Sequence, residues 1–234
     1  MQSNPQLFCF THAGGNTSFF NEIKEELPDL NLIPLEYAGH GIRHREEFYE
    51  NFLELSEDLF RQIEVIYRGG KYGLFGYSMG SISLVEVLKR IISAKMELPY
   101  HVFLAAHEPQ TKSELLGFTP NELDDWVKER TLEFGAVPEA LISNRVFWRT
   151  YLPIYRADYS LIAKYDFTEL NLKTKIPASI FYSETDTPYE YMSKWRDYFV
   201  GECNFRQFVG THFFIRDFHR EMAEYIEKKM GVAA

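Results

Sequence analysis

The sequence predicts an α/β fold in which helices flank a mostly parallel central sheet. Short runs typical of strands alternate with segments whose apolar residues recur every three or four positions, and this alternation is typical of a parallel sheet covered by helices. Hydrophobic residues make up 45% of the 234 residues, so the chain can bury a large core and line a pocket.

The first hundred residues supply the first strands and helices of this pattern. We expect strands over residues 6–10, 30–35, 72–75 and 100–106. Apolar residues three or four positions apart predict helices over residues 19–27, 52–66 and 82–92. Pro28 ends the first helix and Gly69-Gly70 ends the second. The third helix is apolar on most of its surface, so we expect it to be buried.

The alternation breaks between about residues 107 and 172, where no convincing strand is present. Thr119-Pro-Asn-Glu122 has the form of a capping box with proline at the first helical position, so a helix should begin there. We interpret residues 107–172 as a helical lid insertion in a single domain over residues 1–234. The remaining elements are a strand over 178–182, a helix over 191–198, a strand over 204–209 and a closing amphipathic helix over 215–226.

Charge and composition exclude several partners and locations. A net charge of −9 argues against nucleic acid, because phosphate binding needs a basic face. No apolar run approaches the roughly 18 residues that a membrane span needs, and residues 1–5 lack the features of a signal peptide. We therefore expect a soluble, cytoplasmic protein. Cys9 and Cys203 each lie in a short apolar run, which favours two buried thiols over a disulfide.

The segment Gly76-Tyr-Ser-Met-Gly80 fits the pattern G-x-S-x-G of a nucleophile elbow. Its glycines let a strand turn sharply into a helix, which lifts the serine oxygen out of the sheet. The pattern often occurs by chance, and the alternative is a tight turn with an incidental serine. Because a predicted strand precedes the segment and a predicted buried helix follows it, we interpret Ser78 as a catalytic nucleophile in an α/β-hydrolase fold.

One of the seven histidines is placed to act as the base that takes the serine proton. His212 lies between the last predicted strand and the last helix, where the chain order Ser, acid, His of α/β-hydrolases places the base. The others are interpreted as loop-stabilising or structural: His12, His40, His44, His101, His107 and His219. His40 and His44 have the spacing of metal ligands, but no third ligand lies nearby, so we expect no metal site.

The acid that orients the base is expected at Asp186. Ser183-Glu-Thr-Asp186 follows the fifth predicted strand, so this carboxylate should emerge at the sheet edge that carries the nucleophile and the base. Two alternatives stay open. Glu184 lies in the same turn in another register, and Glu108 follows the fourth predicted strand, where some related hydrolases place their acid. Two further carboxylates are expected to make structural hydrogen bonds: Asp158 and Asp217.

Two backbone N–H groups are expected to stabilise the oxyanion that develops during acyl transfer. In this fold one belongs to the residue after the nucleophile, Met79. The second should come from the turn Thr11-His-Ala-Gly-Gly-Asn16, where Ala13 is the expected donor. Gly14-Gly15 let the backbone approach a substrate, although they are also compatible with a simple turn. The turn lacks both G-x-G-x-x-G and a Walker lysine, so it is a poor phosphate loop.

With these residues placed, the chain resembles the external, type II thioesterases that accompany nonribosomal peptide and polyketide synthases, nearly from end to end. Phe8-Cys-Phe-Thr-His-Ala-Gly-Gly15 is similar to the opening F-P-x-A-G-G segment of that family, and Gly39-His-Gly41 resembles its P-G-R/H loop. Gly76-Tyr-Ser-Met-Gly80 is similar to its G-H-S-M-G elbow, and Gly210-Thr-His-Phe-Phe resembles its G-x-H-F-F segment. Tyr151-Leu-Pro-Ile-Tyr-Arg-Ala-Asp-Tyr159 resembles L-P-x-x-R-A-D-Y/F, which general esterases lack.

The chain departs from the family pattern at several positions. Tyr77 stands where the family has histidine, Thr11 and His12 replace a proline and an aromatic or small residue, and Ala38 replaces the loop proline. These positions bear on the shape of the site and hence on substrate preference. Ser183 replaces a glycine before the acid, and a serine is more strained than glycine if the turn needs a positive φ.

The resemblance implies hydrolysis of acyl groups from the phosphopantetheine arm of carrier proteins, which removes wrongly primed or stalled chains. Acyl or peptidyl carrier domains of a synthase would then be the partners, the enzyme would need no cofactor of its own, and we expect a monomer. The alternatives are a carboxylesterase or medium-chain acyl thioesterase on the same fold, and a non-catalytic binding module. Acidic carriers would need a local basic patch on a chain of this charge, with these candidates: Arg43, Arg45, Lys128 and Arg130.

Overall fold

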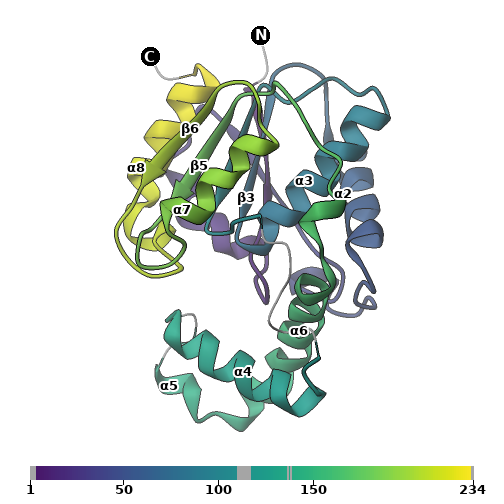
Figure 1. Cartoon of the computed structure of the whole chain (residues 1–234), viewed down its shortest axis with the longest axis vertical. Helices are drawn as coiled ribbons and strands as arrows, with labels where there is room; N and C mark the ends of the chain where they lie inside the picture. The colour runs from purple at the N-terminus through teal and green to yellow at the C-terminus, as the bar shows by residue number, and fades with distance from the viewer. Residues whose placement is uncertain (1–3, 110–116, 136, 138, 233–234) are drawn as a thin grey trace.

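A computed structural model describes residues 4–109, 117–135, 137 and 139–232 of the chain. Within these residues six strands form one sheet in the order β2-β1-β3-β4-β5-β6, and every neighbouring pair is parallel. The strands are β1 (Gln6–Phe10), β2 (Asn31–Leu35), β3 (Tyr72–Tyr77), β4 (His101–Ala105), β5 (Ala178–Tyr182) and β6 (Cys203–Gln207). Helices cover both faces of the sheet (Figure 1), which confirms the predicted fold class.

The sheet separates two hydrophobic cores, because successive side chains of a strand point to opposite faces. In β1, Phe8 and Phe10 contribute to one core, while Leu7 and Cys9 contribute to the other. The first core is covered by α2 (Phe52–Ile66) and α3 (Met79–Ser93), and the second by α1 (Asn21–Glu25) and α8 (Ile215–Met230). Every residue of β1, β3, β4 and β5 is buried, as a sheet covered on both faces requires.

Most observed elements lie close to their predicted ranges and differ at their ends. The helix predicted over 191–198 is instead a short α-helix, Tyr189–Met192, followed by a 3-10 helix, Ser193–Asp197. The first helix opens with a 3-10 turn over Thr17–Phe20, because Asn16 caps that turn by accepting a hydrogen bond from the Ser18 N–H. The closing helix α8 extends beyond its apolar pattern and ends at Gly231, which adopts a left-handed conformation with φ 61°. The shorter helical segments are η1 (Thr17–Phe20), η2 (Gly41–Arg43), η3 (Phe167–Glu169), α7 (Tyr189–Met192) and η4 (Ser193–Asp197).

Three α-helices lie in the described part of the segment between β4 and β5, and we call them the lid helices. They are α4 (Pro120–Glu133), α5 (Glu139–Ile142) and α6 (Arg145–Lys164). Figure 1 shows them gathered at one end of the molecule, beyond the edge of the sheet. The predicted capping box is present, since Thr119 Oγ1 accepts from the Glu122 N–H and the Glu122 carboxylate accepts from the Thr119 N–H. α4 packs on α6 through Leu123, Val127 and Tyr155.

Two expectations from composition also bear on the fold. Cys9 is buried, Cys203 is half-buried, and both are free thiols. None of the helices in the described ranges has the length and apolar character needed to cross a membrane.

Candidate active site

The turn from β3 into α3 places Ser78 at the carboxyl edge of the sheet. Ser78 adopts φ 55° and ψ −121°, a strained conformation for a residue with a side chain. Its N–H donates to the carbonyl oxygen of Ala105 at 2.8 Å, which holds the turn against β4. A Cβ at Gly80 would lie 2.0 Å from the carbonyl oxygen of Phe10, and a Cβ at Gly76 would lie 2.4 Å from that of Gly80. Close backbone approach therefore requires both glycines of the elbow.

The side chains of Ser78, His212 and Asp186 form a chain of hydrogen bonds. Ser78 Oγ lies 2.8 Å from Nε2 of His212, and Nδ1 of His212 lies 3.0 Å from each carboxylate oxygen of Asp186. The Asp186 and His212 side chains are 6% and 10% exposed, so the contacts are shielded from water. With a proton on Nδ1, the imidazole presents the lone pair of Nε2 to Ser78 and can accept the serine proton. The structure thus brings together the residues predicted as nucleophile, base and acid.

Asp186 lies in a tight turn after β5. Its N–H donates to the carbonyl oxygen of Ser183 at 3.1 Å. Ser183 does not adopt a positive φ, so the strain considered for a serine at this position does not arise. Instead the Ser183 hydroxyl donates to the carbonyl oxygen of Gly210 at 2.6 Å, which links this turn to the loop that carries the histidine. Glu184, the alternative acid in the same turn, accepts from the Tyr189 N–H at 3.4 Å.

The predicted oxyanion donors are Met79, which follows the serine in the chain, and Ala13. Met79 is the first residue of α3, so its N–H has no acceptor within the helix. Ala13 lines the same small cavity as Ser78. The next residue, Gly14, adopts φ 74°, and a Cβ there would lie 2.1 Å from the ring of Tyr155. This turn therefore needs glycine because a side chain of α6 packs directly on its backbone.

Asp158 joins α6 to two loops at the carboxyl edge of the sheet. Its Oδ2 accepts hydrogen bonds from the Gly14 N–H at 2.6 Å and from Nε2 of His40 at 2.9 Å. Nδ1 of His40 donates to the carbonyl oxygen of Ala38 at 2.9 Å, so both ring nitrogens face acceptors. Burial disfavours the charged imidazole, but the Asp158 carboxylate outweighs burial and raises the pKa of His40 above its usual value. His40 and Asp158 therefore have structural roles, as the sequence suggested.

Two other histidines, the half-buried His12 and the buried His101, are held in the neutral form. His12 packs edge-on against Phe19 and Phe213, with ring centroids 4.5 and 4.8 Å away, and burial lowers its pKa to about 3. His101 contacts the Ser179 hydroxyl at 2.9 Å, and burial lowers its pKa to about 4. Within the described ranges, no group of three His, Cys, Asp or Glu residues is placed to hold a metal ion.

The lid helices close the site over the serine. Phe134, the residue that ends α4, stacks on the His212 imidazole with ring centroids 4.2 Å apart and planes 17° apart. The remaining cavity has a volume of about 10 Å³ and is lined in part by Thr131, Tyr155 and Tyr159 of these helices. Such a volume holds about one water molecule, so we expect the residues around it to rearrange when an acyl chain enters. No sequence pattern pointed to Phe134.

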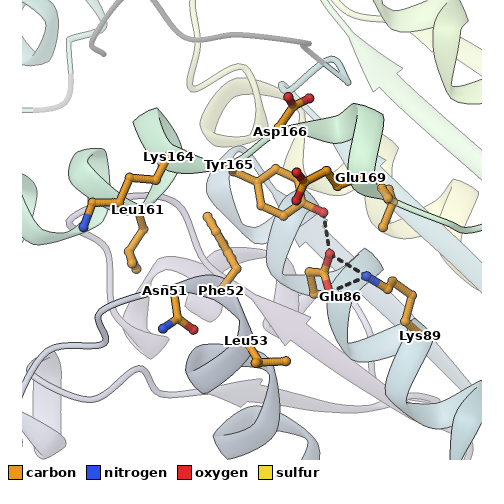
Figure 2. A pocket seen from close by; sticks show the side chains of 11 residues that line it. Asn51, Phe52, Leu53, Glu86, Lys89, Leu161, Lys164, Tyr165, Asp166 and Glu169 are labelled. Carbon is orange, nitrogen blue, oxygen red and sulfur yellow. Dashed lines mark hydrogen bonds and ion pairs between the residues drawn. The ribbon is translucent and has the colours of Figure 1, made fainter. Parts of the chain in front are cut away.

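A larger cavity of about 270 Å³ lies apart from these residues, between α2, α3 and the end of α6 (Figure 2). In Figure 2 the hydroxyl of Tyr165 donates to the Glu86 carboxylate at 2.6 Å, and Lys89 pairs with the same carboxylate at 3.0 Å. Phe52 and Leu161 supply its apolar lining. The cavity marks the place where the lid helices rejoin the core, away from the serine.

Known proteins share both the sequence pattern and the fold of this chain. The model of the Thioesterase domain family matches residues 5–230. The S-acyl fatty acid synthase thioesterase, medium chain, of Rattus norvegicus is 27% identical over 98% of this chain and 89% of its own length. Thioesterase PikA5 of Streptomyces venezuelae is 23% identical over 97% of this chain and 81% of its own length. The solved structure of ClbQ from the colibactin NRPS/PKS pathway has a TM-score of 0.87 at 23% identity, and the match covers 98% of both chains, which supports the fold.

Proposed function

Because this chain belongs to the thioesterase family and is a hydrolase of thioesters, we propose that it works through an acyl-enzyme formed on Ser78. His212 acts as the general base, and Asp186 orients the imidazole and stabilises its charged form. The observation that carries the proposal is the unbroken chain of hydrogen bonds from Ser78 through His212 to Asp186. The same chain of contacts argues against a non-catalytic binding module.

In the first half of the proposed reaction, His212 Nε2 takes the proton of Ser78 as the serine oxygen attacks the thioester carbonyl carbon. The carbonyl oxygen becomes an oxyanion, and the N–H groups of Met79 and Ala13 donate to it. When the tetrahedral intermediate collapses, the carbon–sulfur bond breaks and the leaving sulfur takes the proton from His212. The products are a free thiol and an ester of Ser78.

In the second half, the same imidazole deprotonates a water molecule that attacks the ester carbonyl. Collapse of this second intermediate returns the proton to the serine oxygen and releases the carboxylic acid. Every proton moves between the substrate, water, Ser78 and His212, so the proposed reaction needs no cofactor of the enzyme's own.

We propose that the thioester is carried on the phosphopantetheine arm of an acyl or peptidyl carrier protein. The rat relative is named for a fatty acid synthase, and ClbQ is named as a protein of the colibactin NRPS/PKS pathway. These names support a substrate carried on a synthase, and we propose that the enzyme removes wrongly primed or stalled chains from a nonribosomal peptide or polyketide synthase. A second candidate is the release of medium-chain fatty acids, which the name of the rat relative favours.

The basic residues considered for carrier docking differ in how far they are engaged. The guanidinium of Arg43 donates to the carboxylates of Glu46 and Asp58, so this arginine holds its own loop. Arg45 is exposed, and Lys128 and Arg130 are partly exposed. Lys128 pairs with Asp125 at the surface of α4, a kind of contact that contributes little to stability. Arg130 pairs with Glu133 and also lies over the ring of Phe134. We therefore propose Arg45 and Lys128 as the residues that an acidic carrier contacts first.

Replacement of the nucleophile tests this function. Ser78→Ala should lower turnover of an acyl-pantetheine thioester on the order of a million-fold with the fold intact, because the residues of such a triad act as a unit. His212→Ala should be nearly as damaging, while His44→Ala, at an exposed histidine, should leave the rate unchanged. Mass spectrometry of the wild-type protein should detect an acyl group on Ser78. Near wild-type hydrolysis by Ser78→Ala would rule out the mechanism.

A further inference from the structure

We propose that Tyr77 and Ser183 are positioning residues that hold the His212 loop from two sides. The inference rests on the proposed function, because it assigns these residues a role only through the base. Neither side chain is placed to touch a substrate, and their role follows from their contacts with two backbone carbonyls of the loop between β6 and α8.

The phenol of Tyr77 joins the C-terminal part of that loop to the start of α8. Its hydroxyl donates to the carbonyl oxygen of His212 at 2.8 Å and accepts from the N–H of Ile215 at 3.4 Å. Ile215 is the first residue of α8, where N–H groups lack acceptors within the helix. The Tyr77 side chain is fully buried, and burial raises the pKa of its phenol well above the usual value, so the hydroxyl keeps its proton and remains a donor.

Packing fixes the orientation of the Tyr77 ring. The ring lies 5.1 Å from that of Phe19, 5.6 Å from that of Phe214, and parallel to that of Phe213 at 6.5 Å. Tyr77 is also the residue immediately before Ser78, at the end of β3. Tyr77 therefore fixes the position of the base relative to β3, the strand that carries the nucleophile.

The second contact comes from the turn that carries the acid. The Ser183 hydroxyl donates to the carbonyl oxygen of Gly210 at 2.6 Å, and the Thr185 hydroxyl donates to the same oxygen at 2.7 Å. Gly210 and His212 lie two positions apart in a loop without regular backbone pairing. Their two carbonyls are thus held by the acid turn on one side and by the elbow on the other, independently of the bonds between the three side chains.

Such contacts matter for rate because proton transfer needs the base within hydrogen-bond reach of the serine, and displacement by about 1 Å can lower a rate about a hundredfold. Loss of the Tyr77 hydroxyl frees the His212 carbonyl and the Ile215 N–H together. We expect Tyr77→Phe to lower kcat by about tenfold or more and to leave KM within about twofold, since the substrate does not contact the phenol.

The matched control is Tyr72→Phe. Tyr72 lies at the other end of β3, is buried, and donates to the carbonyl oxygen of Glu97, so this change also removes one buried tyrosine hydroxyl bond. Both variants should lose some thermal stability, and kinetics are therefore measured well below either melting temperature. Only Tyr77→Phe should lower kcat.

A double-mutant cycle with His212→Ala separates positioning from general support of the fold. In His212→Ala the backbone carbonyl remains but the imidazole is gone. Tyr77→Phe should therefore lower the residual hydrolysis of an activated thioester by less than about twofold in that background. Ser183→Ala, tested in the same cycle, keeps the proposal testable if Tyr77→Phe does not fold.

If Tyr77→Phe lowers the hydrolysis rate by the same factor with and without the imidazole, the proposal is overturned. Wild-type kcat in both Tyr77→Phe and Ser183→Ala would also overturn it. If His212→Ala itself keeps wild-type activity, the proposed function fails instead, and the two failures are distinguished by that single variant.

Discussion

Ser78 shows how backbone geometry at single residues creates the candidate site. The serine adopts a positive φ in the turn between β3 and α3. This turn brings the backbones of β1, β3 and α3 so close together that only glycine fits at positions 76 and 80. The first N–H groups of α3, beside the serine, then have no acceptors within the helix. Close packing at Gly76 and Gly80 thus holds Ser78 in its strained backbone conformation.

We expect Gly80→Ala to destabilise the fold by about 3 kcal/mol or more, because the new methyl group would overlap the carbonyl oxygen of Phe10 and backbone cannot yield as a side chain can. Gly69→Ala is the control. Gly69 has φ 80°, but no atom lies within 4 Å of the place that a methyl group would take, so only about 1 kcal/mol of backbone strain is expected. Urea denaturation of both variants measures the difference, and equal losses would contradict the packing argument.

The acid can be tested in the same way. Asp186→Asn should lower turnover by about four orders of magnitude, because an amide neither orients the imidazole in the same way nor stabilises its charge. Glu108→Gln, at the alternative position, should keep most of the activity. Steady-state kinetics at neutral pH compares the two, and a larger loss in Glu108→Gln would assign the acid to the residue after β4.

At the scale of elements, the second half of α6 and the residue after it contact the core at two places. Asp158 contacts the Gly14 N–H and His40 near the site, and Tyr165, which follows the helix, contacts Glu86 of α3 beside the larger cavity. The end of α4 also contacts the core: Phe134 stacks on His212, and the carbonyl oxygen of Gly135 accepts from Arg216 at 3.1 Å.

The contact between His40 and Asp158 should make stability depend on pH. The folded-state pKa of His40 is raised, so its contribution is fully present below the usual histidine value near 6.5 and is lost as pH rises through the raised value. Asp158→Asn should therefore lower the free energy of unfolding by about 2 kcal/mol at pH 6 and by less at pH 9. Asp217→Asn, at an exposed carboxylate, is the control. Denaturation curves should show the same effect of this change on the free energy of unfolding at pH 6 and at pH 9.

For the whole molecule, the small cavity at Ser78 and the net charge of −9 both limit how a carrier protein can deliver its substrate. The arm must reach Ser78 while the carrier stays outside the lid helices, so binding energy remote from the thioester can help to open them. An acidic carrier is repelled by the chain as a whole and needs local basic residues to dock.

We expect kcat/KM to be higher for an acyl group on a carrier protein than for the same group on a short thiol, and to fall with salt only for the carrier. Arg45→Glu and Lys128→Glu should lower the carrier value and reduce its salt dependence, without changing hydrolysis of the short thioester. Measurements with both substrates at two salt concentrations test this. Equal efficiency on both substrates would remove the reason for a carrier partner.

The sequence by itself determined the order of elements, the elbow and the place of the histidine. These features depend on local patterns: apolar spacing, the glycines around Ser78, and the position of His212 between the last strand and the last helix. Each pattern is complete within about 20 residues, so a single sequence carries it. The capping box at Thr119 was predictable for the same reason.

Tertiary structure decided the contacts between distant residues that no local pattern indicates, and it shows which of the predicted groups meet. Ser78 and His212 are 134 positions apart, and His40 and Asp158 are 118 apart. The choice of Asp186 over Glu184 and Glu108 as the partner of His212, the bond from Tyr77 to the His212 carbonyl and the stacking of Phe134 all arise where loops from different strands converge. Local periodicity cannot specify such contacts, because they depend on how the sheet and the lid helices pack in three dimensions.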